Sequence, residues 1–337
     1  PYNLAFIRDL QPFAVRCASD VLHDAGFAHA FFYGSDAHFD EMQRFVEAHG
    51  YAELATQVEL PSSLPRGTWD GITDLAVVDE AVRRAAAAEG PRFSFVMSLS
   101  NHSPFTPPQD LPAEVSARVA EALDANPNTA SADDRLRLVT WSYTDAAVAR
   151  LFSGLEQTGL DARSVVLLMA DHSTGHAWVW GEAPEETDDA KARIPFAIVF
   201  PEALRASVGD VAAFDAAVAR VQTLLEEAPL SQNDVPALLL ALLSAHPGVR
   251  ALPEAQRWHT LGGQVTSPYF DPGLDDGAYV LGINGISELY ALDRQGKRVG
   301  DYEDSVFLKT RADRYRVTPR LIPVTATLQE VLRSTPP

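Results

Sequence analysis

Residues 164–172 read SVVLLMADH, a nearly continuous apolar run that leads directly into a carboxylate, Asp171, and an imidazole, His172. Strands of a parallel sheet are covered on both faces, so their sequences are apolar almost throughout and do not alternate. The run Ser164–Met169 therefore predicts a buried strand. Three other runs have the same character, at Ala28–Tyr33, Phe93–Leu99 and Ile194–Phe200.

Amphipathic helical patterns lie between these strands. Apolar residues recur in them at the three- and four-residue spacing that places side chains on one face of a helix. The stretches are Ala14–Ala25, Phe39–Ala48, Asp79–Glu89, Ala113–Ala125, Asp134–Thr158 and Val211–Glu227. Because strands and helices alternate, the sequence predicts an α/β fold: a doubly wound, mostly parallel sheet with helices on both faces.

The sequence changes in character after about residue 275. Two short strand-like runs, Ala278–Ile283 and Glu288–Leu292, are followed by the turn-prone residues 293–296, and a helical pattern returns at Thr327–Arg333. We therefore expect two domains, a large α/β domain over residues 1–275 and a small antiparallel sheet with a helix over residues 276–337.

Composition excludes some classes of protein. The 337 residues carry 27 Lys and Arg against 46 Asp and Glu, a formal net charge of −19. Proteins that coat nucleic acid need clustered cations, so we expect no nucleic-acid partner. Cys17 is the single cysteine and cannot form an internal disulfide. The longest apolar stretches, such as Val235–Ser244, fall short of the roughly 20 residues that span a bilayer.

Polar residues at the carboxyl ends of strands are the first candidates for a site, because ligands of open α/β sheets bind there. A carboxylate and an imidazole, as at Asp171 and His172, are a usual ligand pair for Zn²⁺ or Mn²⁺. The alternative is an aspartate that caps the next turn beside a solvated imidazole. His176 lies in the same loop and either reaches the metal or the substrate or is an ordinary loop side chain.

Two further strand ends carry polar groups. His102 follows the strand at 93–99 and could hold a phosphoryl oxygen or protonate a leaving group; the alternative is a loop imidazole bonded to backbone. The strand at 28–33 ends in Tyr33, followed by Gly34, Ser35 and Asp36, which is more typical of a tight turn than of a binding site.

Five runs of sequence, taken in order, carry a family resemblance. They are FFYGSDAHFDEMQRFVEAHGY (31–51), GTWDGITD (67–74), FSFVMSLSNHSPF (93–105), YTDAAVARLFSGLEQTGLDARSVVLLMADHS (143–173) and RIPFAIVFP (193–201). Together they resemble the sulfatase-type catalytic domain of the lipoteichoic-acid synthase and phosphoglycerol transferase group, within the alkaline phosphatase superfamily. The resemblance covers about residues 14–245.

The resemblance implies a metal-dependent enzyme on the outer side of the cytoplasmic membrane. Such an enzyme transfers a phosphoglycerol-type group from a phospholipid donor to a glycan or polymer acceptor through a covalent intermediate on Thr. Asp171 and His172 match the metal ligands, with Mn²⁺ as the first choice over Mg²⁺ or Zn²⁺, and His102 matches the histidine that binds the substrate phosphate. Tyr33, Ser35 and Asp36 lie where the family lines the headgroup pocket, with His176 as a further substrate contact, while Trp69, Gly71 and Asp74 match a stretch to which we assign a structural role.

Two elements of the family pattern have no counterpart in residues 1–337, namely the glutamate ligand of the first strand and the Thr nucleophile. Cys17 lacks the proline and arginine of the formylglycine motif that sulfatases use, which favours a helix or core thiol. We therefore expect further sequence upstream of Pro1, where membrane anchors would also lie, and an N-terminal segment or another chain that completes the sheet. The alternatives are a sulfate- or phosphate-ester hydrolase on the same fold, and a non-catalytic glycan- or lipid-binding remnant.

Overall fold

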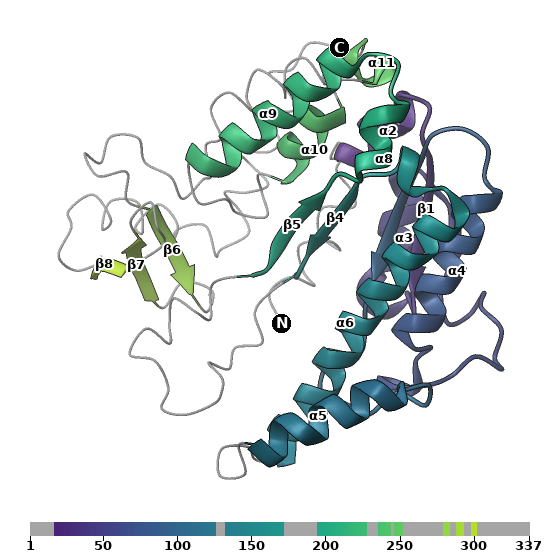
Figure 1. Cartoon of the computed structure of the whole chain (residues 1–337), viewed down its shortest axis with the longest axis vertical. Helices are drawn as coiled ribbons and strands as arrows, with labels where there is room; N and C mark the ends of the chain where they lie inside the picture. The colour runs from purple at the N-terminus through teal and green to yellow at the C-terminus, as the bar shows by residue number, and fades with distance from the viewer. Residues whose placement is uncertain are drawn as a thin grey trace.

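The structure is a computed structural model of the chain (Figure 1). It describes residues 17–125, 132–171, 194–227, 235–243, 246–251, 279–283, 288–292 and 298–301, and the statements below concern these residues.

A three-stranded parallel sheet organises the N-terminal half. Strand β1 (Ala28–Tyr33) lies between β2 (Tyr51–Ala55) and β3 (Arg92–Met97), and both pairs are parallel. Every side chain of β1 after the first residue is buried, as expected for a central strand covered on both faces. The prediction of β1 is confirmed at both ends. The sequence did not predict β2, because its five residues, YAELA, are too few and too mixed in polarity to give a clear period.

Helices cover both faces of this sheet. Phe32 packs in a cluster with residues of α4 (Asp74–Ala87), and its neighbour Phe31 packs on the opposite face with residues of α3 (Met42–Ala48). Each of these rings is at most 1% exposed, and burying one side chain of this size contributes about 2–3 kcal/mol. The predicted α/β architecture, a parallel sheet between helical layers, is thereby confirmed (Figure 1).

A second sheet contains β4 (Val166–Met169) and β5 (Phe196–Val199). Both strands were predicted, but they pair antiparallel, with Val166 opposite Val199, so the parallel direction expected for them is not found between them. The predicted burial is also incomplete, since only Val166 of the two strands is fully buried. An apolar run can pair in either direction, and its sequence therefore does not reveal that direction. Side chains of α9 (Val211–Glu227) and α10 (Val235–Leu243) pack against β5.

The predicted helices are found with small shifts of their ends. Helices α5 (Ala113–Ala125) and α9 agree with the prediction at both ends, and α4 begins five residues earlier than predicted, after Thr73 as its N-cap. The other helices of the described residues are α2 (Ala18–Asp24), α6 (Ala132–Thr158), α8 (Glu202–Ser207) and α11 (Pro247–Arg250), with 3₁₀ turns at Phe39–Glu41, Thr68–Asp70 and Asp161–Arg163. None of the helices in the described ranges is long and apolar enough to cross a membrane.

The C-terminal part contains a third sheet. Strands β6 (Tyr279–Ile283), β7 (Glu288–Leu292) and β8 (Arg298–Asp301) pair antiparallel in this order, which confirms the predicted small antiparallel sheet. The predicted helix at Thr327–Arg333 and the boundary between residues 275 and 276 lie outside the described residues, so the division into two domains stays a prediction.

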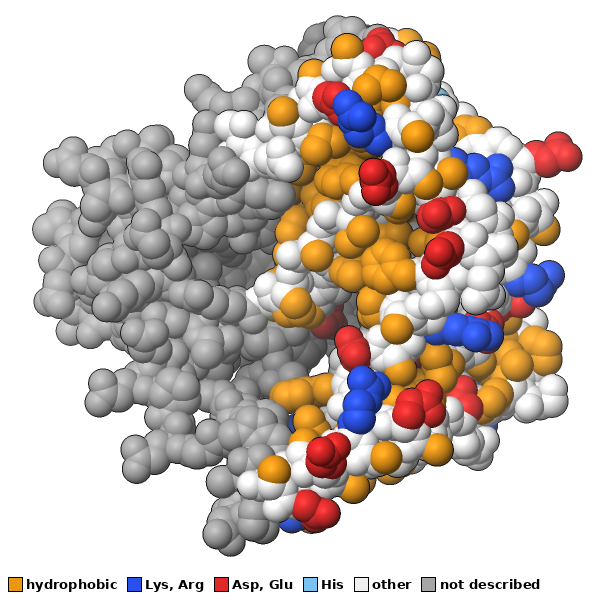
Figure 2. Space-filling model, viewed as in Figure 1, with side chains coloured by type: hydrophobic (Ala, Val, Ile, Leu, Met, Phe, Trp, Pro, Cys, Tyr) orange, Lys and Arg blue, Asp and Glu red, His pale blue; other side chains and the backbone are white. Residues whose placement is uncertain are grey.

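Charged side chains of both signs are interspersed on the face in Figure 2, around a central hydrophobic area. Among the side chains coloured there, no continuous basic area is visible, in keeping with the acidic composition.

Candidate functional site at the carboxyl edge of the parallel sheet

The segment before α4 joins the carboxyl ends of β1 and β3. The amide of Ile72 donates to the carbonyl oxygen of Gly34, just after β1, at 2.7 Å. The two chains approach so closely that a Cβ on Gly34 would clash with the Ile72 carbonyl oxygen, which explains why glycine occupies position 34. The stretch GTWDGITD is therefore held at the carboxyl edge of the sheet, where ligands of this class of fold bind.

Asp74 fixes the start of the loop that follows β3. Its carboxylate is 3% exposed and accepts hydrogen bonds from the amides of Leu99 at 2.8 Å and Ser100 at 3.2 Å. Burial raises the pKa of this carboxyl group, and the two amide donors oppose that shift. Asp74 therefore acts as an internal cap for the loop, consistent with the structural role expected from the sequence.

His102 lies on the surface of this loop, beside an aromatic ring. Its ring centroid is 4.0 Å from that of Trp69, whose side chain is 43% exposed and whose backbone has a φ of 55°. The Nδ1 atom of His102 lies 2.7 Å from the carbonyl oxygen of Ser103. A carbonyl can only accept, so Nδ1 carries the proton and Nε2 is the atom available to an external group.

The residues predicted near the end of β1 have different environments. Tyr33 is 3% exposed and packs in the core cluster with Leu99, so its ring is a packing group in this structure. Asp36 is exposed and accepts from the backbone amide of His38 at 2.9 Å and its ring at 2.7 Å, and these contacts lower the pKa of Asp36. Ser35 is half-buried, and its carbonyl oxygen accepts from the amide of Gln57. Substrate binding by these three residues stays a prediction.

Asp171 is exposed and lies two residues after β4, at the end of that strand as predicted. Its proposed partner His172, and His176 in the same loop, lie outside the described residues. The structure thus brings Gly34, Trp69, Asp74 and His102 to one edge, and the metal ligation assigned to Asp171 and His172 stays a prediction.

A groove of about 760 Å³ lies between α4, α5 and α6. None of the predicted site residues is among the described residues that line it, and charged side chains in it are engaged with one another, as in the ion pair of Asp79 with Arg150 at 2.6 Å. We therefore assign the site to the sheet edge and not to this groove.

Two features at or near the sheet were not assigned to a function from the sequence. Trp69 was given a structural role, although its exposed ring lies against His102. A contact between Cys17 and His49 joins residues 32 positions apart in the chain, a separation that fits no short motif. Trp69 has a left-handed backbone conformation, which its sequence context does not indicate.

Part of the sequence is similar to a known transferase. Phosphoglycerol transferase I of Salmonella arizonae is 25% identical over 173 residues, which make up 49% of this chain and 21% of the transferase. The chain thus matches about a fifth of the length of this relative.

Solved structures share the fold. The lipoteichoic acid synthase LtaP of Listeria monocytogenes superposes with a TM-score of 0.54 at 14% identity, over 96% of this chain and 74% of LtaP. A protein of the alkaline phosphatase superfamily from Vibrio parahaemolyticus gives a TM-score of 0.50 at 20% identity, over 83% of this chain and 58% of that protein. The family model described as Sulfatase matches residues 6–245, well over half of the sequence. With the α/β fold and its layered sheet, this match establishes that the chain belongs to the Sulfatase family.

Proposed function

We propose that this chain carries catalytic machinery for transferring a phosphoglycerol-type group from a phospholipid to a glycan or polymer acceptor. The proposal rests on the position of His102 at the carboxyl edge of the sheet. Its ring lies against the ring of Trp69, and it belongs to the loop whose first amides are bound by Asp74. The distant similarity to a phosphoglycerol transferase supports this choice of substrate class.

In this proposal His102 binds the phosphoryl group through Nε2. Protonated, the ring donates from Nε2 to a phosphoryl oxygen while Nδ1 remains bonded to the Ser103 carbonyl. Contact with the indole of Trp69 restricts rotation of the imidazole, so little orientational freedom is lost when substrate binds. The exposed indole face offers an apolar surface to the glycerol or acyl part of the substrate.

A divalent cation, with Mn²⁺ as first choice, fits the donor chemistry of the residues that follow β4. Asp171 supplies a carboxylate at an exposed strand end, and His172 would supply an imidazole. When bound, such a cation neutralises charge on phosphoryl oxygens. The proposal assigns no nucleophile within residues 1–337.

The partners follow from the same chemistry. The donor would be an anionic phospholipid such as phosphatidylglycerol, and the acceptor a glycan or polymer, so we place the activity outside the cytoplasm, at the membrane surface.

A hydrolase of sulfate or phosphate esters is the second candidate, because the family model that matches is that of the sulfatases. A non-catalytic glycan- or lipid-binding protein is the third. The three candidates differ in which bond, if any, is broken.

The test compares wild type with His102→Ala in the full polypeptide as the cell makes it. Vesicles containing phosphatidylglycerol are supplied with Mn²⁺, and diacylglycerol release is measured. We expect wild type to release diacylglycerol and His102→Ala to be slower by about 100-fold or more, because removal of one hydrogen-bond donor to the charge that develops in the transition state costs about this much. His23→Ala, an exposed histidine of α2, is the matched control and should keep the wild-type rate.

p-Nitrophenyl sulfate and p-nitrophenyl phosphate are assayed in parallel. Hydrolysis of either ester without diacylglycerol release would replace the transferase by the second candidate. No turnover of any substrate, with retained vesicle or glycan binding, would favour the third.

A further inference from the structure

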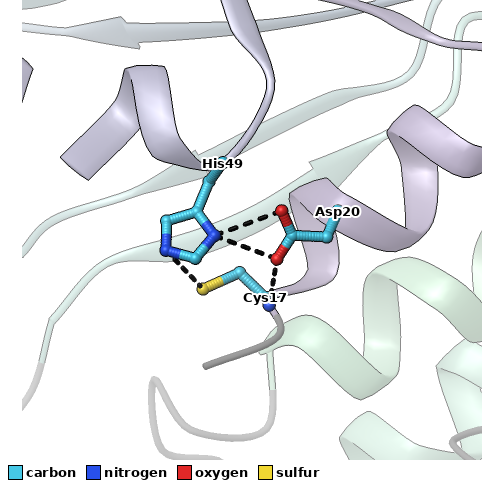
Figure 3. A group of neighbouring side chains, drawn as sticks. All are labelled: Cys17, Asp20 and His49. Carbon is cyan, nitrogen blue, oxygen red and sulfur yellow. Dashed lines mark hydrogen bonds and ion pairs between the residues drawn. The ribbon is translucent and has the colours of Figure 1, made fainter. Parts of the chain in front are cut away.

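Three side chains from two distant segments meet near the amino end of the parallel sheet: Cys17, Asp20 and His49 (Figure 3). Cys17 is the N-cap of α2 and Asp20 lies in its first turn, whereas His49 follows α3 and precedes β2. Each residue offers a donor atom within 4.8 Å of the others, and this is the one such group of three or more His, Cys, Asp or Glu in the described ranges.

Asp20 fixes the orientation of the imidazole. Its two carboxylate oxygens lie 2.9 and 3.1 Å from Nδ1 of His49, and one of them also accepts from the Cys17 amide at 2.6 Å. A carboxylate accepts only, so Nδ1 carries the proton and the lone pair of Nε2 is directed away from Asp20. A carboxylate behind a histidine is the usual outer-shell support of a metal-binding imidazole.

Nε2 faces the sulfur of Cys17, with an Sγ to Nε2 distance of 3.8 Å (Figure 3). Zinc lies about 2.3 Å from thiolate sulfur and about 2.0 Å from imidazole nitrogen, so two such ligands at a tetrahedral angle are about 3.5 Å apart. The separation found here is thus close to that required for both atoms to bind one ion. Little movement of either side chain would be needed.

The surroundings suit a bound ion with some access to water. The side chains of His49 and Asp20 are 12% and 21% exposed. His29, opposite Tyr51 in the β1–β2 pair, is 3% exposed, so the apolar interior of the sheet begins next to this group.

We propose that Cys17 and His49 bind a thiophilic divalent cation of the zinc class, with Asp20 supporting His49. Sulfur and nitrogen donors favour zinc over Mn²⁺ or Mg²⁺, which prefer oxygen. On binding, the Cys17 thiol releases its proton to solvent as the sulfur–metal bond forms, and water completes the coordination. The group lies beside the beginnings of β1 and β2, whereas the proposed phosphoryl-transfer residues follow the carboxyl ends of strands, so the two proposals are independent.

The test uses Co²⁺ as a spectroscopic probe on the full chain. Cys17 is the single cysteine, so a thiolate-to-cobalt charge-transfer band in the near ultraviolet can come only from this residue. We expect one equivalent of Co²⁺ to give the band, added Zn²⁺ to abolish it by displacement, and Cys17→Ser and His49→Gln each to remove or strongly weaken it. Asp171→Ala is the matched control and should keep the band, whatever the outcome of the activity assay.

Circular dichroism checks that the variants fold. If either does not, iodoacetamide labelling of wild-type Cys17 gives the same information, because bound Zn²⁺ should slow the labelling several-fold. Absence of the band together with labelling that is indifferent to Zn²⁺ would overturn the proposal. A band that survives His49→Gln unchanged would overturn the imidazole assignment.

Discussion

Asp74 shows how one buried carboxylate fixes a functional loop. It lies at the start of α4, yet its hydrogen bonds go to the amides that follow β3, so a single side chain ties a helix to the carboxyl edge of the sheet. Removing an acceptor leaves buried donors unsatisfied, which costs more than the net value of the bonds themselves.

Asp74→Ala should therefore lower the free energy of unfolding by about 2–4 kcal/mol, as two amides lose their acceptor. Asp79→Ala on the same helix is the control: its ion pair with Arg150 is about half exposed on both sides and is worth at most about 1 kcal/mol. Urea denaturation with fitted slopes measures both values. Equal losses for the two variants would contradict the role given to Asp74.

Individual site residues differ in how far the sequence predicts them. His102 and Asp171 could be proposed because each lies shortly after an apolar strand, where the fold places ligands. Cys17 and His49 could not, because their contact joins the start of α2 to the segment between α3 and β2, and no short-range spacing in the sequence indicates it. The burial of Tyr33 was also beyond the sequence, since a strand end does not reveal which face its last side chain occupies.

Helix α4 is attached to the sheet by a chain of charged residues as well as by its apolar face. Glu80 accepts from Arg83 and Arg84, Arg84 also contacts Glu53 of β2 at 3.1 Å, and Glu53 contacts Arg92 of β3 at 2.7 Å. Hydrogen bonds from Arg83, and then from Arg84, lower the pKa of Glu80 from 4.5 to about 2. A carboxyl group whose pKa is lowered on folding stabilises the protein only while it is ionised.

The contribution of Glu80 should therefore be complete above about pH 4.5 and disappear as the pH falls towards 2. We expect Glu80→Gln to lower the free energy of unfolding by about 1 kcal/mol near neutral pH. This gap between the unfolding free energies of variant and wild type should narrow progressively in acid. Chemical denaturation across this pH range gives the gap, with Glu121→Gln on the exposed face of α5 as control. A gap that is constant with pH would show that ionisation of Glu80 is not its origin.

Most of the helices and strands were predictable, because the spacing of apolar residues in the sequence distinguishes a helix from a strand. Helices α5 and α9 and strand β1 were found at the expected residues. The antiparallel direction of β5 and the existence of β2 were not predicted, since direction is set by the path of the connecting chain and a five-residue strand gives too little pattern.

For the molecule as a whole, the net charge of the chain and the charge of the proposed phospholipid substrate are both negative. A chain with a charge of −19 repels anionic phospholipid, so productive binding requires local positive charge at the site. A divalent cation bound by Asp171, after β4, would supply it, which makes cation binding by Asp171 the central claim of the functional proposal.

The most direct test is Mn²⁺-dependent release of diacylglycerol from phosphatidylglycerol vesicles by the full polypeptide and its Asp171→Ala variant. Loss of a carboxylate ligand should reduce turnover on the order of 1,000-fold, corresponding to several kcal/mol of charge stabilisation, while circular dichroism shows that the variant is folded. A folded Asp171→Ala protein that turns over phosphatidylglycerol at the wild-type rate would contradict the account.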